Sequence, residues 1–198
     1  EQPSGVRYTG FAHGNSGIHP YLFRAGKIIG DERCSELTGD SLRFERSCIT
    51  DDRDGWHRGD KDKKVTHLWC HGSSGILLSK LLLFRDGYRD GMIENEIISA
   101  VLTVQKNGFG KSPTYCHGDL GNLSVIDLAG RTLDNAMLRN SVFNTFNDLY
   151  TGTLSRNWKK KELKSCNSYG LMIGLSGWGY SLLSHYTDFE IPQFLWLE

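Results

Sequence analysis

The sequence predicts an all-α fold assembled from repeated helical hairpins, on the strength of three observations. A short motif, Gly-x-x-Gly, occurs four times in 198 residues, with steps of 58, 46 and 56 residues between successive first glycines. Apolar residues at helical spacing follow the motif, and the alternation typical of strands is scarce. One motif that recurs about every 50 residues indicates a repeat architecture. Four units are expected, near residues 10–57, 68–110, 114–165 and 168–198.

The four motifs also account for an unusual glycine content. The chain has 23 glycines and only four prolines, whereas an average protein of this length would have about 14 glycines. The motifs supply eight glycines, close to the whole surplus of about nine, and they begin at Gly14, Gly72, Gly118 and Gly174. Because glycine tolerates tight turns that other residues resist, we expect each motif to be an ordered turn into a buried helix.

Each unit is expected to hold one buried helix and one half-exposed helix. Apolar residues between positions 18 and 29 have the spacing of a helix face. The run from Ile76 to Leu83 is apolar nearly all round, which indicates a buried helix. A more amphipathic stripe follows in the second unit at Ile93, Ile97, Ala100, Val101 and Val104. The corresponding stripe in the third unit is formed by Leu138, Val142, Phe146 and Leu149.

The distribution of charge excludes two classes of protein. Lys and Arg number 23, as do Asp and Glu, so a main role in holding nucleic acid or an anionic membrane is not expected. The uncharged stretch 165–187 carries too many glycines and serines for a membrane span. Residues 51–64, charged at ten of fourteen positions, are expected to form a solvated loop. The basic cluster from Arg156 to Lys164 is expected to be an exposed helix face, with a contact for an acidic or extended peptide as the alternative.

Reactive side chains stand at equivalent places in the repeats. His13 precedes the first motif, Cys70 and His71 precede the second, and Cys116 and His117 precede the third. If the units are related by rotation, these side chains converge on one face, where two thiols and an imidazole would suit Zn²⁺ with an open catalytic position. The alternative is a pair of buried core cysteines inherited by duplication. The residues alone leave both histidines open as the third ligand.

The remaining cysteines and histidines are expected to be structural. Cys34, Cys48 and Cys166 lie away from the motifs and are interpreted as core or incidental thiols. Five cysteines without a Cys-x-x-Cys pair favour a reducing, intracellular setting. Asp119, inside the third motif, is expected to cap the helix that follows rather than to catalyse a reaction. Structural or exposed positions are expected for His19, His57, His67 and His185.

In order along the chain, the motifs resemble the signatures of lanthionine synthetase cyclases. The matching segments are residues 10–14 (GFAHG), 69–72 (WCHG), 115–118 (YCHG) and 170–177 (GLMIGLSG). The last residues, 191–198 (IPQFLWLE), are similar to the end of class II bifunctional synthetases, in which the cyclase domain follows a dehydratase domain. The resemblance covers essentially all of residues 1–198, as the C-terminal part of a cyclase domain. It implies an α/α toroid of seven helical hairpins, of which this chain would hold about four.

The resemblance also implies a site and a reaction. Cys70, Cys116 and His117 match the zinc ligands of the family, for one Zn²⁺ per domain, and His13 matches its general acid/base. A substrate thiol would ionise on the metal and attack a dehydroalanine or dehydrobutyrine of the same peptide, and an imidazole would return a proton at neutral pH. The implied products are the lanthionine and methyllanthionine rings of lantibiotic biosynthesis. The alternative is a non-catalytic zinc-binding relative that binds glutathione or a partner protein.

The implied substrate is a dehydrated precursor peptide. The implied protein partners are a dehydratase domain or the remaining cyclase repeats, either in the same chain or in trans, and an export transporter. No nucleic-acid partner is expected. The implied location is the cytoplasm, including the membrane periphery. Two departures from the family pattern stand out, since an acidic residue used by some members lies in an earlier repeat and Thr66 stands where some stand-alone cyclases have arginine. About four hairpins alone would expose apolar faces, so we expect a C-terminal part of a longer synthetase or a chain that needs a complement.

Overall fold

The computed structural model of the chain describes residues 5–52, 54–151, 168–187 and 191–197. These residues form helices joined by turns and loops, and the β structure among them is limited to isolated bridges. A short 3-10 turn, η1 (Asn15–Gly17), precedes the first helix. The α-helices are α1 (His19–Ile29), α2 (Arg33–Arg46), α3 (Ser73–Arg85), α4 (Ile93–Asn107), α5 (Asp119–Thr132), α6 (Ala136–Tyr150) and α8 (Leu175–Tyr186).

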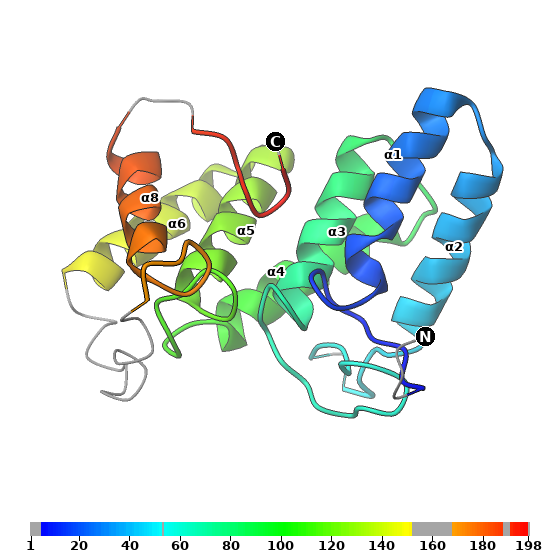
Figure 1. Cartoon of the computed structure of the whole chain (residues 1–198), viewed down its shortest axis with the longest axis horizontal. Helices are drawn as coiled ribbons and strands as arrows, with labels where there is room; N and C mark the ends of the chain where they lie inside the picture. The colour runs from blue at the N-terminus through cyan, green and yellow to red at the C-terminus, as the bar shows by residue number, and fades with distance from the viewer. Residues whose placement is uncertain (1–4, 53, 152–167, 188–190, 198) are drawn as a thin grey trace.

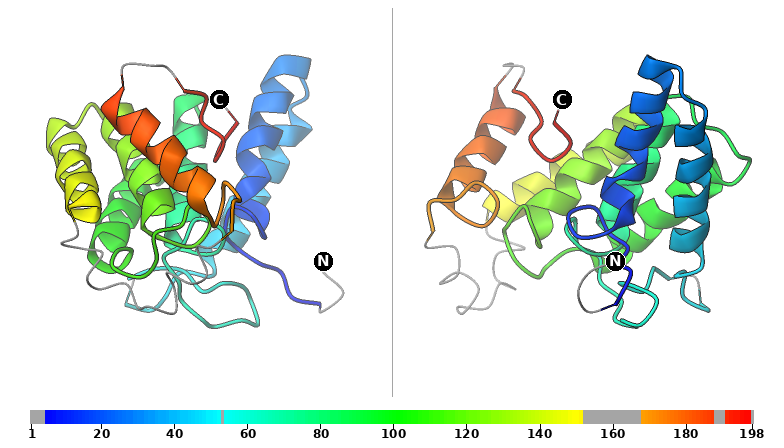
Figure 2. Two further views of the ribbon diagram at one scale, coloured as in Figure 1. Left: turned by 60° about the vertical axis from the view of Figure 1, so that its left-hand side comes forward. Right: turned by 45° about the vertical axis from the view of Figure 1, so that its right-hand side comes forward.

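The helices pair into hairpins that stand side by side. Helix α1 packs on α2, α3 on α4 and α5 on α6, and the pairs follow one another across the molecule from α1 to α8 (Figure 1). The first helices of neighbouring pairs also meet, α1 with α3 and α3 with α5, so α3 lies in the middle of a row (Figure 2). Helix α8 contacts α6 through stacked rings of His185 and Phe146, whose centroids are 3.8 Å apart. The predicted helical hairpins are confirmed in these three pairs.

Helix α3 is the centre of the hydrophobic core. Its run from Ile76 to Leu83 is buried on all sides, as the apolar pattern predicts. The predicted stripe of α4 is buried throughout, and in α6 all of the stripe except the half-buried Leu138 is buried. Burial of one large aliphatic side chain contributes about 1.5–3 kcal/mol, so this central helix stabilises the fold strongly. A Leu81→Ala substitution is expected to cost about 2–5 kcal/mol.

The first helices at the two ends of the row differ from the expectation that each motif opens a buried helix. Helix α1 exposes Ile28 by 79% and Ile29 by 68%, and α8 exposes Leu175 by 55% and Leu183 by 52%. The expectation is correct for α3 and α5, which have neighbours on both sides. It is wrong for α1 and α8, because no described helix packs on their outer sides.

The second glycine of each motif is explained by a close approach within the turn. A Cβ atom at any of these glycines would overlap the carbonyl oxygen of the residue six positions earlier. The four pairs are Gly17 with Phe11, Gly75 with Trp69, Gly121 with Tyr115 and Gly177 with Leu171. The turn therefore folds back onto the first turn of its own helix at a distance that only glycine permits. Four glycines of the surplus in the composition have this steric origin.

The charged segment 51–64 is irregular, as predicted, but it is not wholly solvated. Trp56 is only 3% exposed and lies over the ammonium group of Lys80, whose Nζ is 5.9 Å from the ring centroid. The isolated bridges of Ile49 with Trp56 and of His57 with Val65 join the segment to the residues just before and after it. The basic cluster Arg156–Lys164 lies outside the described residues. Among the described residues, no helix combines the length and apolar character that crossing a bilayer requires.

Candidate functional site

The four glycine-motif turns are joined to one another by backbone hydrogen bonds at one equivalent position. The N–H of Ala12 donates to the carbonyl oxygen of Cys70 at 3.2 Å, and the N–H of Cys70 donates to that of Cys116 at 3.2 Å. The N–H of Cys116 in turn donates to the carbonyl oxygen of Met172 at 2.9 Å. These bonds arrange equivalent residues of successive repeats in a row. Two cysteines that are far apart in the sequence thus become neighbours.

The thiols of Cys70 and Cys116 form a free, hydrogen-bonded pair. Cys70 is buried and Cys116 is half-buried. The hydrogen bond from Cys116 lowers the pKa of Cys70 to about 7, although burial acts in the opposite direction. The same bond, together with burial, raises the pKa of Cys116. Because the thiolate is the form that binds metals, this pair offers one donor that is already partly ionised at neutral pH.

The third predicted zinc ligand is not joined to this pair. His117 is exposed, and among the described residues no group of three His, Cys, Asp or Glu side chains is arranged to hold a metal ion. Two adjacent thiols nevertheless have the donor chemistry that zinc prefers. His71 and His117 each directly follow one cysteine of the pair, so the geometry leaves the third ligand open. The fit to zinc therefore rests on the thiol pair.

The predicted acid/base, His13, lies against the second motif. Its exposed ring stacks on the half-buried ring of His71, with centroids 4.2 Å apart and planes inclined by 10°. Burial, followed by the charges of Arg58 and His13, lowers the pKa of His71 to about 4. His71 is therefore neutral at physiological pH. The structure thus brings His13 next to the turn that carries Cys70, and it leaves the outer side of the His13 ring open.

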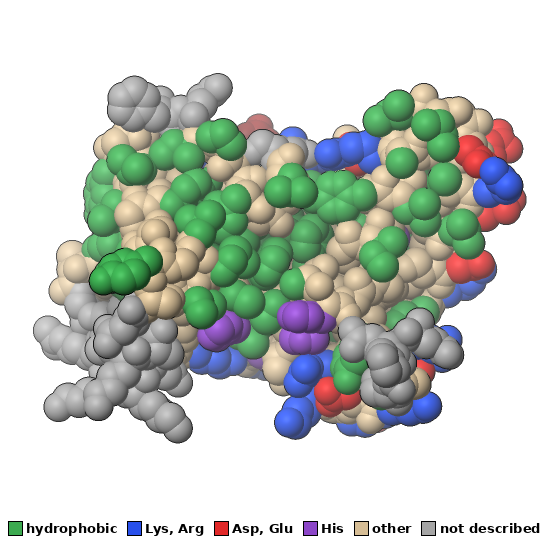
Figure 3. Space-filling view, viewed as in Figure 1, with side chains coloured by type: hydrophobic (Ala, Val, Ile, Leu, Met, Phe, Trp, Pro, Cys, Tyr) green, Lys and Arg blue, Asp and Glu red, His purple; other side chains and the backbone are tan. Residues whose placement is uncertain are grey.

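A groove of about 520 Å³ opens beside His13. Its walls combine apolar side chains, among them Tyr8, Phe11, Ile18 and Phe44, with the polar side chains of Arg7 and Asn15. Figure 3 shows histidine side chains at the surface of one face, bordered by a broad stretch of hydrophobic side chains. Ligand sites generally combine mostly apolar walls with a few polar groups. The groove could hold an apolar side chain of an extended peptide close to the imidazole.

Two further positions from the sequence are resolved by their contacts. The expectation that Asp119 caps a helix is wrong. Its fully buried carboxylate instead accepts hydrogen bonds from the N–H groups of Gly110 and Lys111, because the preceding loop folds over it. Thr66 donates from its hydroxyl to the carbonyl oxygen of His71 at 2.6 Å. Thr66 therefore braces the second turn.

Most of the other predicted structural side chains do pack inside the fold. Cys48 is buried and Cys34 is half-buried, whereas Cys166 lies outside the described residues. His19 is fully buried and His67 half-buried, and the His67 Nδ1 atom is 3.2 Å from Ser73 Oγ. The half-buried rings of His57 and His185 contact backbone carbonyl oxygens. None of these side chains meets the thiol pair in the contacts of the described residues.

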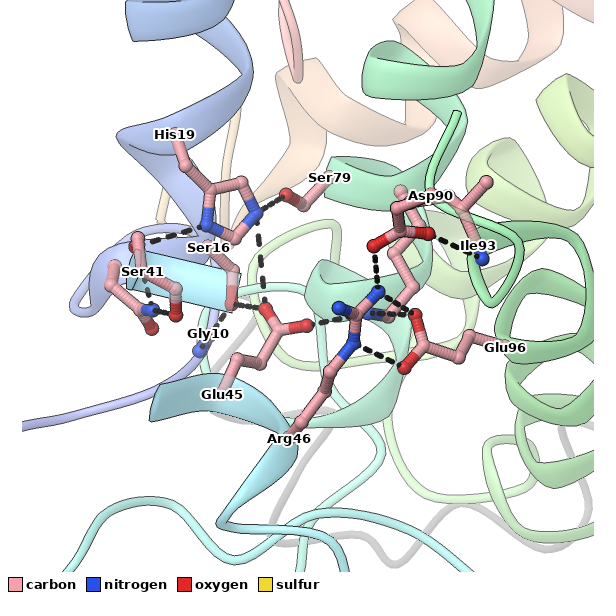
Figure 4. A network of polar contacts seen from close by, with 12 residues as sticks. Gly10, Ser16, His19, Ser41, Glu45, Arg46, Ser79, Asp90, Ile93 and Glu96 are labelled. Atoms are coloured by element: carbon pink, nitrogen blue, oxygen red, sulfur yellow. Dashed lines mark hydrogen bonds and ion pairs between the residues drawn. The ribbon is translucent and has the colours of Figure 1, made fainter. Parts of the chain in front are cut away.

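Sequence analysis missed a buried ionic cluster behind the first motif (Figure 4). Lys80 of α3 and Glu45 of α2 are both fully buried, and Lys80 Nζ lies 2.7 Å from Glu45 Oε1 and 3.0 Å from Glu96 Oε2. Arg46 extends the cluster by ion pairs with Asp90 and Glu96. One signal was available, because Lys80 stands inside the apolar run of a helix that is buried all round. A lysine in such a place requires a buried acidic partner.

Comparison with known proteins places the chain in a family. Residues 1–196 match the family described as Lanthionine synthetase C-like protein. The chain is 28% identical over 185 residues to the Lacticin 481/lactococcin biosynthesis protein LcnDR2 of Lactococcus lactis subsp. lactis, a match that covers 87% of this chain and 20% of that protein. It is 30% identical over 125 residues to Glutathione S-transferase LANCL1 of Danio rerio, covering 58% of this chain and 28% of that protein.

The fold has a solved counterpart. The structure resembles that of nisin cyclase with a TM-score of 0.68 and 19% sequence identity, over 94% of this chain and 48% of that protein. The chain thus spans between a fifth and about half of the length of these relatives. The predicted fold class, an all-α portion of an α/α toroid, is confirmed by this similarity. The chain belongs to the lanthionine synthetase C-like family.

Proposed function

We propose that this chain contains the ring-forming site of a lanthionine synthetase cyclase. In the proposed reaction, a cysteine thiol of a dehydrated precursor peptide adds to a dehydroalanine or dehydrobutyrine of the same peptide, and a thioether ring results. The observation that carries the proposal is the placement of His13 beside the turn of the Cys70–Cys116 thiol pair. The names of two relatives, a lacticin biosynthesis protein and a nisin cyclase, support the same chemistry.

We assign the thiol pair to a zinc site, with Cys70, Cys116 and His117 as the residues that would hold one Zn²⁺. The assignment of His117 rests on the family pattern. Zinc bound there would lower the pKa of a substrate thiol, so that the thiol ionises at neutral pH. The protein residues contribute a pair of thiols in which the hydrogen bond from Cys116 lowers the pKa of Cys70, and a fixed spacing between the second and third turns.

His13 is assigned the proton transfer. Addition of the thiol across the carbon–carbon double bond forms one S–C bond and leaves negative charge on the enolate. The thiol proton leaves to solvent, and the enolate α-carbon must gain one proton. An imidazolium group can deliver that proton and is then reprotonated from solvent. The exposed side of the His13 ring is accessible to a peptide in the adjacent groove.

A second candidate function is binding of glutathione or a partner protein without ring formation. The name of the Danio rerio relative, a glutathione S-transferase, favours this alternative. Glutathione carries a cysteine thiol, so the same thiol-binding groups would recognise it. The two functions differ in their outcome, since a cyclase joins two positions of one peptide, whereas a binding protein would hold glutathione or its partner chemically unchanged.

The remaining cyclase repeats are proposed as the partner of the exposed apolar ends. Helices α1 and α8 expose isoleucine and leucine side chains, and the chain covers 48% of the nisin cyclase chain. Hairpins packed on these two ends would bury that surface, whether they come from the same chain or act in trans. The proposed dehydratase domain and export transporter would act before and after the ring-forming step.

The function is tested with the protein at its natural full length, a dehydrated precursor peptide and, separately, glutathione. Ring formation leaves the mass of the peptide unchanged, so free thiols must be counted by alkylation and mass spectrometry. We expect loss of alkylatable thiols from the peptide. Unchanged peptide thiols together with glutathione bound to the protein, measured by calorimetry, would favour the second function instead.

A further inference from the structure

The buried charges at Glu45 and Lys80 require an explanation beyond packing. Both side chains are fully excluded from solvent, and removing such a pair from water carries a desolvation penalty that their attraction often only offsets. Apolar side chains of similar volume would stabilise the core equally well or better. The presence of the pair therefore points to something that the carboxylate holds in place.

The second carboxylate oxygen of Glu45 reaches the loop that carries His13. The hydroxyl of Ser16, itself fully buried, donates a hydrogen bond to Glu45 Oε2, and it accepts one from the N–H of Gly10 at 3.2 Å (Figure 4). Ser16 lies after His13 in the chain, and Gly10 lies before it. One buried carboxylate thus ties together both ends of the loop 10–16.

The same loop is seated directly on the turn that contains Cys70. Gly10 has a φ of +94°, and a Cβ atom on it would lie 2.9 Å from both the carbonyl oxygen of Cys70 and the Cα of His71. The N–H of Ala12 donates to that carbonyl oxygen at 3.2 Å. Because the two turns are in close contact, a shift of Gly10 would displace the ring of His13 from its stacked position on His71.

We propose that Glu45, acting through Ser16, is a positioning residue that fixes the His13 loop against the Cys70 turn for ring closure. The inference rests on the proposed cyclase function. Lys80 orients the carboxylate through its contact with Oε1. Glu96 pairs with Lys80 in turn, and Arg46 pairs with Glu96. Glu45 and Ser16 touch neither substrate nor the reacting atoms, so their effect is on the place of His13 alone.

The consequence for the reaction is geometric. A general acid must lie within hydrogen-bond reach of the atom that it protonates, and a misplacement of about 1 Å can lower a rate by about a hundredfold. Protonation of the enolate also creates a new stereocentre at the α-carbon. A displaced His13 would slow the step and would let water protonate the other face, so the product would contain both α-carbon epimers.

The first test compares Ser16→Ala with Ser79→Ala in the natural full-length protein. Ser79 is an equally buried serine of the same cluster, and in the contacts of the described residues its hydroxyl bonds to His19 and not to Glu45 or to residues 10–16. We expect Ser16→Ala to lower kcat by about tenfold, to leave KM and zinc content unchanged, and to give a product with both α-carbon epimers. We expect Ser79→Ala to keep the wild-type rate and to give a single epimer. Equal rates and equal epimer ratios for the two variants would overturn the positioning role. A wild-type protein that forms no rings would overturn the proposed function and this inference with it.

A second pair of variants separates the hydrogen-bond acceptor from the charge, in case single changes in the cluster prevent folding. Glu45→Gln with Lys80→Met keeps an oxygen for Ser16, whereas Glu45→Met with Lys80→Met removes it, and both double variants are neutral at the two positions. We expect the double variant with Gln at position 45 to retain the wild-type rate and a single epimer. We expect the double variant with Met at position 45 to lose about tenfold in kcat, although the two double variants have the same melting temperature. Equal kinetics for two folded double variants would refute the proposal.

Discussion

The imidazole rings of His13 and His71 stack face to face, with centroids 4.2 Å apart and planes inclined by 10°. They come from equivalent positions of the first and second glycine motifs. One side of the His13 ring is thus fixed by a neutral, half-buried neighbour, and the other side faces outward. The ring of Tyr8 meets His71 edge-on at 6.1 Å and supports it from behind. The first two repeats thereby supply the imidazole to which we assign proton transfer and the ring on which it stacks.

This arrangement predicts different effects of changes at the two histidines that follow the cysteines. We expect about one zinc per chain in the wild type and loss of zinc in Cys116→Ala and His117→Ala, because removal of a ligand weakens zinc binding strongly. We expect His71→Phe to retain zinc, because a phenyl ring can replace the imidazole as a stacking partner. Metal analysis of protein purified without chelators measures this. Zinc loss in His71→Phe with retention in His117→Ala would reverse the ligand assignment, and zinc-free wild type would refute the site.

A substitution at His13 is expected to separate binding from chemistry. His13→Ala should keep the zinc content of the wild type and slow ring closure by about a hundredfold, the lower end of what a general acid contributes. Thiol counting on the precursor peptide over time gives the rate. His57→Ala is a matched control, since its imidazole contacts the carbonyl oxygen of Lys63 and lies outside the turns. Full cyclisation by His13→Ala would remove this histidine from the mechanism.

The sequence predicts those features that repeat or that have a period. The buried helix at Ile76–Leu83 follows from an apolar run, and the meeting of Cys70 with Cys116 follows from their equivalent places in related turns. In both cases a pattern within a short stretch of sequence determines where the side chains lie in the fold.

Other features depend on contacts between distant segments and escape such patterns. Asp119 has the sequence of a helix cap, yet its carboxylate binds the backbone of Gly110 and Lys111. Glu45 lies in a helix with charged residues along its length, and only the packing of α2 on α1 and η1 and the ion pair with Lys80 of α3 show that this one is buried. The exposure of α1 and α8 is likewise set by which neighbours are present.

The buried His19 predicts a loss of stability in acid. Burial lowers its pKa from 6.5 to about 4, with Lys80 and Arg46 acting in the same direction and Glu45 opposing them. The unfolded chain therefore binds a proton below pH 6.5 that the folded chain refuses until about pH 4. The contribution of His19 to the free energy of unfolding is fully present above pH 6.5. It is lost as the pH falls from 6.5 to about 4, by up to about 1.4 kcal/mol per pH unit.

Urea unfolding at several pH values tests this expectation. His71 also has a pKa lowered to about 4, so the share of His19 is obtained from a His19→Gln variant. We expect that variant to be less stable than the wild type at pH 7 and to lose less stability between pH 6.5 and 4. Parallel losses in the two proteins would contradict the assignment to His19.

The glycine turns give a prediction in which one type of substitution acts in opposite directions. A Cβ atom at Gly121 would overlap the carbonyl oxygen of Tyr115, the residue before Cys116. Relief of that overlap requires the third turn to move, and its N–H and C=O bonds to the neighbouring turns would move with it. Gly121→Ala should therefore lower the melting temperature by several degrees, as expected for a loss of about 1–3 kcal/mol, and should weaken zinc binding.

Gly39 provides the matched control, because it lies in the middle of α2 and a Cβ atom there meets only Arg43 Nη1, at 3.7 Å. Alanine is the better helix former, so Gly39→Ala should stabilise the protein by about 0.5–1 kcal/mol. Thermal unfolding and zinc titration of the two variants side by side measure both effects. If Gly121→Ala were as stable as Gly39→Ala and bound zinc equally well, close packing of the turn would not be the reason for glycine at the motif's second position. The two stability changes are expected to have opposite signs because the surroundings of the two glycines differ, since the same Cβ atom is added in both variants.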